Sequence, residues 1–301
     1  MVSFFLIILS SLLFVGIINK TKSFASGRKG PGVLQNMKDI FRLWRKGSVY
    51  SETTSFIFKI APTAYIASIF MGVLFIPFGS MPGIISFNGD FVMFAYLLAF
   101  GKFLMIISAL DTGSSFEGMG ASRESLFSML AEPAFFMLMG SFALFTGHTS
   151  FESIFSTLNF GSHISYMLGA LATFILVIIA MIENSRMPVD DPKTHLELTM
   201  VHEVMILDNS GFDLGLILYG TNLKFAMYGA LIANFFIGAM PLELSIPMFL
   251  LIQFGFAIAV GIIESFIARF RMSHNPEFIF ILTSLSLLIF FGVLLILGNF
   301  M

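Results

Sequence analysis

Hydrophobic residues in this chain gather in long runs that end at charged residues, glycine or proline. Each run is close to the roughly 20 residues that an α-helix needs to cross a bilayer. The runs cover residues 3–19, 62–79, 91–110, 126–147, 164–182, 215–240, 244–268 and 278–300. The pattern predicts eight transmembrane helices.

The composition agrees with this prediction. Hydrophobic residues make up 57% of the 301 residues and charged residues only 11%, whereas soluble domains carry about 25% charged residues. We therefore expect an all-α integral membrane protein in which residues 1–301 form a single transmembrane domain. The run 3–19 could be the core of a signal peptide, but no basic residue precedes it and no small-residue cleavage site follows it, so we expect a retained span.

Positive charges are confined to alternate connections between the runs. Fourteen of the sixteen Lys and Arg residues lie in four connections, and the segments on the other side hold none. The positive-inside rule places these four connections in the cytoplasm and both termini on the outer side. The long cytoplasmic loops are then residues 20–61, 111–125, 183–214 and 269–277. Because they carry most of the charged residues, we expect the cytoplasmic face to dock partners, and no basic surface for nucleic acid is present.

The first cytoplasmic loop combines a tight turn with an amphipathic segment. Gly27, Gly30 and Gly32 surround Pro31, which indicates a constrained backbone. In the segment 36–46, apolar and cationic residues recur at helical spacing, so a helix there would have an apolar face and a cationic face. The apolar face holds Met37, Ile40, Phe41 and Trp44, and the cationic face holds Lys38, Arg42, Arg45 and Lys46. We expect this helix to lie flat on the membrane, as a basic anchor or as a docking element.

The third cytoplasmic loop predicts a helix over residues 192–208. Asp191 and Pro192 are typical of a helix start, and Asn209 to Gly211 are typical of a helix end. The helix would carry two polar stripes, one with His195, Thr199, His202 and Glu203 and the other with Glu197 and Asp208. Such a helix should lie between a partner protein and a polar cavity. Its two histidines lack the i,i+4 spacing of a zinc helix, so we expect no metal there.

Ionisable residues within or next to the runs are the third signal. Each costs at least ~2.5–3.5 kcal/mol in a bilayer, so it normally faces a partner or a polar cavity. Lys102 lies nine residues before Asp111, and Glu132 lies nine after Arg123. In antiparallel neighbours both would sit at a depth of ~13 Å and could form a buried pair.

Further ionisable groups lie on the same cytoplasmic side. They are Glu183, Lys224 and Glu264, and Glu183 could pair with Arg186 at i,i+3 if its helix continues that far. Together with Lys102 and Glu132, these residues predict a path for protons or ions. The alternative is that each is a structural ion pair or a side chain that snorkels to the interface.

The chain contains no cysteine, which excludes disulfides, thiolate zinc sites and cysteine-ligated iron–sulfur clusters on it. We therefore expect no cofactor on this chain. Any redox metal would belong to a partner subunit.

Four segments, in this order, resemble the subunit 1 family of respiratory complex I. They are residues 27–35, 120–124 with 132–133, 183–188, and 195–203, and the likeness extends from about residue 20 to 275. The hydrogenase branch matches best, that is, the membrane anchor subunit of group 4 membrane-bound nickel–iron hydrogenases of the formate hydrogenlyase subunit 4 type. The resemblance implies eight helices, a redox arm docked on the cytoplasmic loops, and a chain of acids that leads to antiporter-like membrane subunits.

The resemblance also implies roles for individual residues. The connecting path would be lined by Arg123, Glu132, Glu183, Arg186, Asp190, Asp191, Glu197, Glu203 and Asp208, joined by Lys102, Lys224 and Glu264 from the preceding argument. The redox arm would dock on Arg28, Lys29, Gly30, Pro31, Gly32, Gln35, Arg42 and Arg45. The implied partners are a nickel–iron large subunit and an iron–sulfur small subunit, which would hold the nickel–iron centre and the clusters, in a prokaryotic cytoplasmic membrane.

Three hypotheses for function follow. The first is an anchor and proton path in an energy-converting hydrogenase complex. A variant of it is subunit 1 of an NADH-quinone oxidoreductase, which would contribute to a quinone site. The sequence departs from quinone-reducing members around residues 26–32 and 188–193, which favours proton reduction at a partner's nickel–iron centre. The second is an independent transporter, which should show inverted repeats that are not visible here. The third is a structural anchor whose buried charges only fix helix packing.

Overall fold

The computed structural model describes residues 1–158, 163–191, 200–238 and 240–300, and its described elements are helical. They are α1 (Val2–Ser11), α2 (Phe14–Ala25), α3 (Gln35–Trp44), α4 (Phe56–Phe75), α5 (Asp90–Asp111), α6 (Ser115–Thr146), α7 (Phe151–Leu158), α8 (His163–Glu183), α9 (His202–Met205), α10 (Gly211–Ile237), α11 (Leu242–Phe266), the 3-10 turn η1 (Met272–His274) and α12 (Asn275–Phe300). The predicted all-α multi-pass membrane class is therefore confirmed.

The described residues do not confirm all of the eight predicted spans. Within the described residues, six helices are long and apolar enough to cross a membrane, namely α4, α5, α6, α10, α11 and α12. The pair α1 and α2 adds a seventh if it is counted as one span bent by 41°, and the described apolar part of α8 is shorter. The first run is broken where Ser10 and Ser11 donate hydrogen bonds to the carbonyl groups of Ile7 and Ile8, because such back-bonding bends helices.

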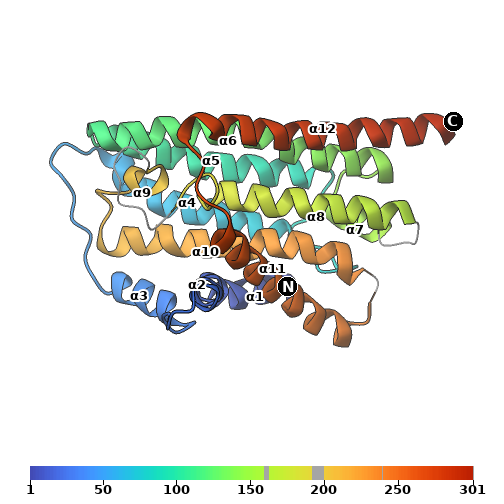
Figure 1. Cartoon of the computed structure of the whole chain (residues 1–301), viewed down its shortest axis with the longest axis horizontal. Coiled ribbons are helices and arrows are strands. Elements are labelled where there is room, and N and C mark those ends of the chain that lie inside the picture. The colour runs from blue at the N-terminus through green and yellow to red at the C-terminus, as the bar shows by residue number, and fades with distance from the viewer. Residues whose placement is uncertain (159–162, 192–199, 239, 301) are drawn as a thin grey trace.

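α10 forms the centre of the bundle. In its most apolar stretch 83% of the residues are buried, compared with 28% in α12. Figure 1 shows α6 and α12 side by side along one edge, and α11 inclined to the other long helices near α1 and α2. α3, α9 and the 45–55 connection lie at one end of the bundle.

α3 confirms the predicted amphipathic helix, but its apolar face packs on protein. Met37 and Ile40 are buried against Tyr219 of α10, and the ring centroids of Trp44 and Tyr219 are 5.4 Å apart. Phe41, predicted on the same face, is half exposed. The helix is thus fixed to α10 rather than resting on lipid through its apolar face.

The predicted helix over residues 192–208 is wrong where the structure describes it. Only His202–Met205 is helical there, and residues 192–199, with His195, Glu197 and Thr199, lie outside the described residues. Tertiary hydrogen bonds replace helical ones. The N–H of His202 donates to Asp190 and the N–H of Asp208 donates to Glu117.

Candidate functional site

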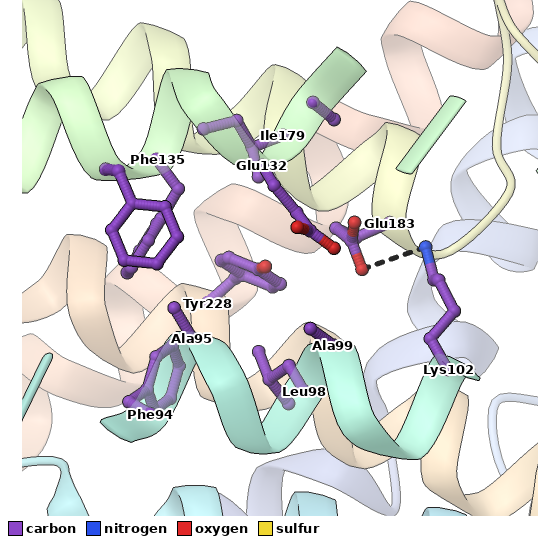
Figure 2. Close-up of a pocket in the computed structure, with 12 residues that line it drawn as sticks. Phe94, Ala95, Leu98, Ala99, Lys102, Glu132, Phe135, Ile179, Glu183 and Tyr228 are labelled. Carbon is purple, nitrogen blue, oxygen red and sulfur yellow. Dashed lines mark ion pairs between the residues drawn. The ribbon is translucent and has the colours of Figure 1, made fainter. Parts of the chain in front are cut away.

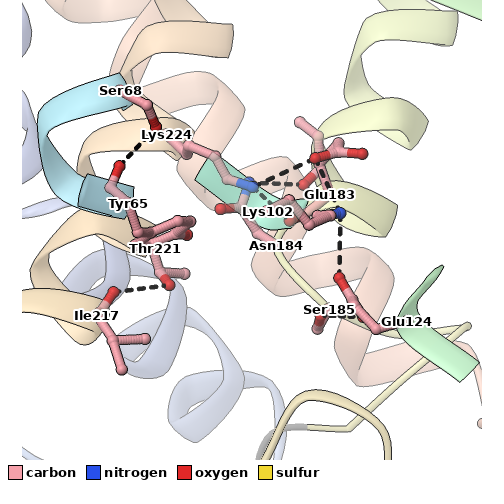
Figure 3. Close-up of polar contacts among 11 residues, drawn as sticks. Tyr65, Ser68, Lys102, Glu124, Glu183, Asn184, Ser185, Ile217, Thr221 and Lys224 are labelled. Atoms are coloured by element: carbon pink, nitrogen blue, oxygen red, sulfur yellow. Dashed lines mark hydrogen bonds and ion pairs between the residues drawn. The ribbon is translucent and has the colours of Figure 1, made fainter. Parts of the chain in front are cut away.

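Four buried side chains from four helices form what we call the central charge cluster: Lys102 of α5, Glu124 of α6, Glu183 of α8 and Lys224 of α10 (Figure 3). The Lys102 ammonium lies 3.0 Å from a carboxylate oxygen of Glu124 and 3.0 Å from one of Glu183. The Lys224 ammonium lies 3.2 Å from the same Glu183 oxygen. Two cations therefore compensate two carboxylates inside the bundle.

The end of α8 helps to position this cluster. Besides its carboxylate contact, Lys224 donates a hydrogen bond to the backbone carbonyl of Glu183, at 2.9 Å. The last carbonyl groups of a helix lack intrahelical partners and carry a partial negative charge. A lysine on the neighbouring α10 can satisfy both the carbonyl and the carboxylate, so the cluster also fixes where α8 ends.

The predicted pair of Lys102 and Glu132 is wrong. Among the described residues no ion pair includes Glu132, because Lys102 binds Glu124 and Glu183 instead. Glu124 is two helical turns closer to the start of α6 than Glu132. A long lysine side chain can extend toward the polar end of its helix, and two carboxylates there bind it better than one at equal depth.

Glu132 nevertheless opens onto the cluster. It lines a narrow cavity of about 30 Å³ together with Lys102, Glu183 and Tyr228, which is room for one or two water molecules. Figure 2 shows the carboxylate of Glu132 pointing toward that of Glu183. On its other side Glu132 is exposed on the surface of the isolated chain, so it connects the cluster with the outside of the bundle.

A second group of charges surrounds Glu264. One carboxylate oxygen lies 3.4 Å from Arg186 and the other lies 2.8 Å from Lys22. The expected pairing of Glu183 with Arg186 does not form, because α8 ends at Glu183 and Ser185 adopts a left-handed conformation with φ +50°. Arg186 then turns toward Glu264 and lies over the ring of Phe225.

Asp190 ties the third cytoplasmic loop together. Its carboxylate accepts hydrogen bonds from Arg269, at 2.8 Å, and from the N–H of His202, at 3.0 Å. Burial raises the pKa of Asp190 to about 6, although Arg269 and the N–H groups oppose that rise. Burial also lowers the pKa of His202 to about 4, so its imidazole is neutral at pH 7.

The remaining predicted path residues lie around this loop. Arg123 donates a hydrogen bond to the carbonyl of Met200 at 2.8 Å, and Asp191 is half-buried beside Asp190. Glu203 lines a polar cavity of about 160 Å³ with Arg186 and His202, between the loop, α2, α3 and α10. The side chain of Asp208 is exposed, away from the central charge cluster.

The predicted docking residues fall in two places. Arg28, Lys29 and Gly30 line a pocket between the ends of α2 and α11. Arg42 and Arg45 are exposed on α3 and just after it, where Arg42 pairs with Asp39 and Gln35 donates to the same carboxylate. Pro31 and Gly32 are exposed in the turn between the two places.

Sequence reasoning missed Glu124 and Glu117. Both are buried on α6, and they are seven residues apart, which places them on one helix face. Charges repeated at that spacing in the first turns of an apolar helix were the available signal. Among the described residues, no group of three or more His, Asp or Glu side chains is arranged to hold a metal ion.

Comparison with known proteins places this geometry in a family. The family model described as NADH dehydrogenase matches residues 1–294. The chain is 31% identical over 225 residues to hydrogenase-4 component C of Escherichia coli (strain K12), which covers 75% of this chain and 70% of that protein. It is 26% identical over 273 residues to formate hydrogenlyase subunit 4 of the same organism, which covers 88% of each.

A solved structure has the same fold. A chain of the membrane-bound sulfane sulfur reductase, an archaeal respiratory membrane complex, superposes with a TM-score of 0.83 over 96% of both chains at 18% identity. The family match spans almost the whole chain, and two hydrogenase-type relatives align with most of it. The chain therefore belongs to the subunit 1 family of respiratory complex I, on its hydrogenase branch.

Proposed function

We propose that this chain is the membrane anchor and proton-path subunit of an energy-converting, membrane-bound hydrogenase complex in a prokaryotic cytoplasmic membrane. The observation that carries the proposal is the central charge cluster, with a polar cavity on one side and the exposed Glu132 on the other. The proposed partners are a nickel–iron large subunit, an iron–sulfur small subunit and antiporter-like membrane subunits. The nickel–iron centre and the iron–sulfur clusters would sit on those partners.

The linings of the cavities suggest the order of the path. The 160 Å³ cavity and the narrow space around the cluster share Asn184, His202 and Thr221. The cluster and the 30 Å³ cavity share Lys102 and Glu183. We call the 160 Å³ cavity the loop cavity. A proton would thus pass from the loop cavity to Glu124 and Glu183, and then through water to Glu132 at the surface of the bundle.

Electrostatic coupling within the cluster would transmit a charge change in the redox arm. Two unit charges 4 Å apart interact by about 4 kcal/mol at an effective dielectric constant of 20. Lys102 contacts two carboxylates, so protonation of one strengthens its hold on the other. A change of charge near the loop can therefore change the proton affinity of Glu183 and then of Glu132.

Exposure of Glu132 supports a contact with another membrane subunit. An exposed carboxylate in a membrane-spanning helix is costly in lipid. A polar group on an antiporter-like neighbour would cover it and receive the proton. Glu132→Gln keeps the size of the side chain but removes the titration. We expect this variant to assemble with normal subunit content and to keep hydrogen turnover, but to lose proton translocation.

The measurement combines a pH-sensitive dye in vesicles with hydrogen turnover. Glu277→Gln, which changes an exposed carboxylate near the start of α12, is the matched control and should keep pumping. Unchanged pumping per electron in Glu132→Gln would show that the path runs elsewhere. Failure of Glu132→Gln to assemble would instead assign Glu132 a structural role.

Docking of the redox arm is proposed for the exposed cationic surface of α3. Reversing Arg42 and Arg45 to Glu should detach the nickel–iron and iron–sulfur subunits, because it replaces two exposed positive charges with negative ones. Immunoblots of washed membranes measure this. Reversal of Lys20 and Arg271, which are exposed on other segments of the chain than α3, is the control. Wild-type retention of the arm on the Arg42 and Arg45 variant would contradict the proposal.

The size of the loop cavity argues against the quinone variant of this function. Pockets that bind ligands of the size of a quinone usually measure about 300–1,000 Å³ and are mostly apolar. The cavity beside Arg186 and His202 measures about 160 Å³ and is lined by several polar side chains. Identification of the subunits that co-purify with the chain separates the two, since a nickel–iron subunit and a quinone-linked NADH module differ in composition.

A further inference from the structure

A pocket of about 450 Å³ opens between the C-terminal ends of α2 and α11. We call it the α2–α11 pocket, and it is distinct from the central charge cluster. Its volume is within the range of sites that hold small molecules. It lies at the end of α11, which is long enough to cross a membrane, and of α2, the second half of the bent α1–α2 pair. We expect lipid headgroups at this level.

The charges of the pocket favour an anion. Lys22, Arg28 and Lys29 line it together with a single carboxylate, Glu264, so the lining has a formal excess of two positive charges. Glu264 is already bound by Lys22 and by Arg186. Arg28 and Lys29 are exposed where they line the pocket, and no carboxylate of the pocket is left to neutralise them.

The turn that carries these two cations is held in place. The N–H of Arg28 donates to the carbonyl of Ser23, and the N–H of Gly27 donates to that of Phe24. Gly27 has φ +67°, a conformation that favours glycine. Any side chain at Gly30 would collide with Ser23. The turn is thus folded back on α2, and its cations are positioned before a ligand arrives.

An apolar stripe leads away from the pocket along α11. Its residues recur every three or four positions and are exposed in this chain, the last of them on the rim of the pocket: Leu251, Phe254, Ile258, Ile262 and Phe266. Such a stripe on a membrane-spanning helix lies against acyl chains. Phe24, near the end of α2, is 87% exposed and flanks the same region.

We propose that the α2–α11 pocket binds the headgroup of an anionic phospholipid, whose acyl chains lie along the exposed stripe of α11. Arg28 and Lys29 bind the phosphate, and Lys22 contributes the N–H donors that its bond to Glu264 leaves. Basic pockets of this kind at the ends of membrane helices recognise anionic headgroups. A soluble phosphate would use the same cations but would make no use of the stripe.

Native mass spectrometry of the detergent-solubilised full chain tests the proposal. The probes are dioleoyl-phosphatidylglycerol, dioleoyl-phosphatidylcholine and inorganic phosphate. We expect phosphatidylglycerol to bind at least tenfold more tightly than either of the others. Arg28→Gln with Lys29→Gln should weaken that binding by roughly tenfold or more, since each basic side chain contributes substantially to anionic lipid binding.

The matched control is Lys38→Gln with Lys46→Gln, which removes the same charge from exposed positions in and after α3 and should bind phosphatidylglycerol as the wild type does. Phe266→Ala, which keeps every charge, should weaken phosphatidylglycerol severalfold and leave inorganic phosphate unchanged. Equal loss in the two glutamine pairs would overturn the proposal, since the binding would then reflect surface charge alone. Binding of inorganic phosphate as tight as that of phosphatidylglycerol would also overturn the proposal, because the pocket would then be a site for a soluble anion. Loss of the lipid when the co-purified subunits are attached would overturn it too, because a protein would then cover the pocket.

Discussion

Lys102 and Lys224 hold carboxylates from two other helices against α5 and α10. Both lysines and both carboxylates of the central charge cluster are nearly or fully removed from solvent. Ion pairs of this kind add little net stability by themselves, but loss of one member leaves an uncompensated buried charge. The cluster is therefore sensitive to changes at single residues.

Replacement of Lys102 by Met should lower the free energy of unfolding by about 3–5 kcal/mol. Glu124 would lose its ion-pair partner while Glu183 would keep Lys224. SDS titration in mixed micelles measures the change. Lys38→Met on the exposed surface of α3 is the control and should alter stability by no more than about 0.5 kcal/mol. An equal effect of the two substitutions would contradict a buried, compensating role for Lys102.

The two titrating groups of the third loop should affect stability in opposite directions. Asp190 has its pKa raised from 3.8 to about 6 in the folded chain, so the folded state binds the proton more tightly. The stability that this raised pKa gives the folded state is present below pH 4 and is lost as the pH rises through about 6. His202 has its pKa lowered from 6.5 to about 4, so its contribution is present above pH 6.5 and is lost as the pH falls toward 4.

Asp190→Asn should therefore make stability rise more steeply with pH between 4 and 6.5. His202→Gln should make it fall, or rise less, over the same window, and it keeps the backbone N–H that binds Asp190. Unfolding measured at several pH values between 4 and 7 for the wild type and both variants gives the slopes. Parallel curves for the wild type and Asp190→Asn would show that Asp190 does not titrate in this range.

Among the elements, α3 is held in place by its two buried side chains, Met37 and Ile40. Ile40→Ala should cost about 2–5 kcal/mol, since Ile40 is fully buried between α3 and α10. We expect faster proteolysis at the loops on both sides of α3. Phe41→Ala, on the exposed side of the same helix, should leave the cleavage rate nearly unchanged. Equal cleavage of the two variants would mean that α3 is not held by its buried face.

The contact between α6 and α9 requires a glycine. A Cβ atom at Gly120 would lie 2.8 Å from the carbonyl oxygen of Val201 and 2.9 Å from the backbone nitrogen of Met205. Gly120→Ala should thus displace α9 and lower the thermal unfolding temperature. Gly140→Ala, later in α6, meets only the ring of Phe290 at 3.9 Å, and should keep or raise that temperature because alanine favours helix. A fall in both variants would point to α6 itself.

Hydropathy predicted some elements better than others. The run 91–110 corresponds closely to α5 (Asp90–Asp111), whereas the run 126–147 covers only part of α6 (Ser115–Thr146). The first turns of α6 are polar, and their residues make tertiary contacts: Glu117 accepts the N–H of Asp208 and Arg123 binds the carbonyl of Met200. Such contacts connect residues more than seventy positions apart, so local periodicity cannot show them.

The candidate site was predicted in the same uneven way. Spacing along helices placed Lys102 and Lys224 at a comparable depth and Glu183 nearer the cytoplasmic end, and the structure brings the three together. It could not identify Glu124 as the partner of Lys102, because side-chain reach decides between carboxylates two turns apart. It also could not show that Arg186 turns from Glu183 to Glu264, since that depends on the conformation of Ser185.

At the scale of the whole molecule, the absence of cysteine makes the orientation easy to test. The distribution of Lys and Arg predicts that the loop with Ser51 is cytoplasmic and that the connection with Asn88 is outside. In intact cells, a membrane-impermeant maleimide should label Asn88→Cys and should label Ser51→Cys only after permeabilisation. Both positions are exposed. The reverse labelling pattern would invert the proposed orientation.

The exposed carboxylate of Glu132 has a consequence for how the chain is produced. A copy that is inserted without its neighbours leaves this group facing lipid, at a cost of at least ~2.5 kcal/mol while it is ionised. Binding of a partner that covers it shifts the equilibrium toward the folded form in proportion to partner concentration. The steady amount of this subunit in a cell would then follow the supply of its membrane neighbours, with surplus copies removed by proteolysis.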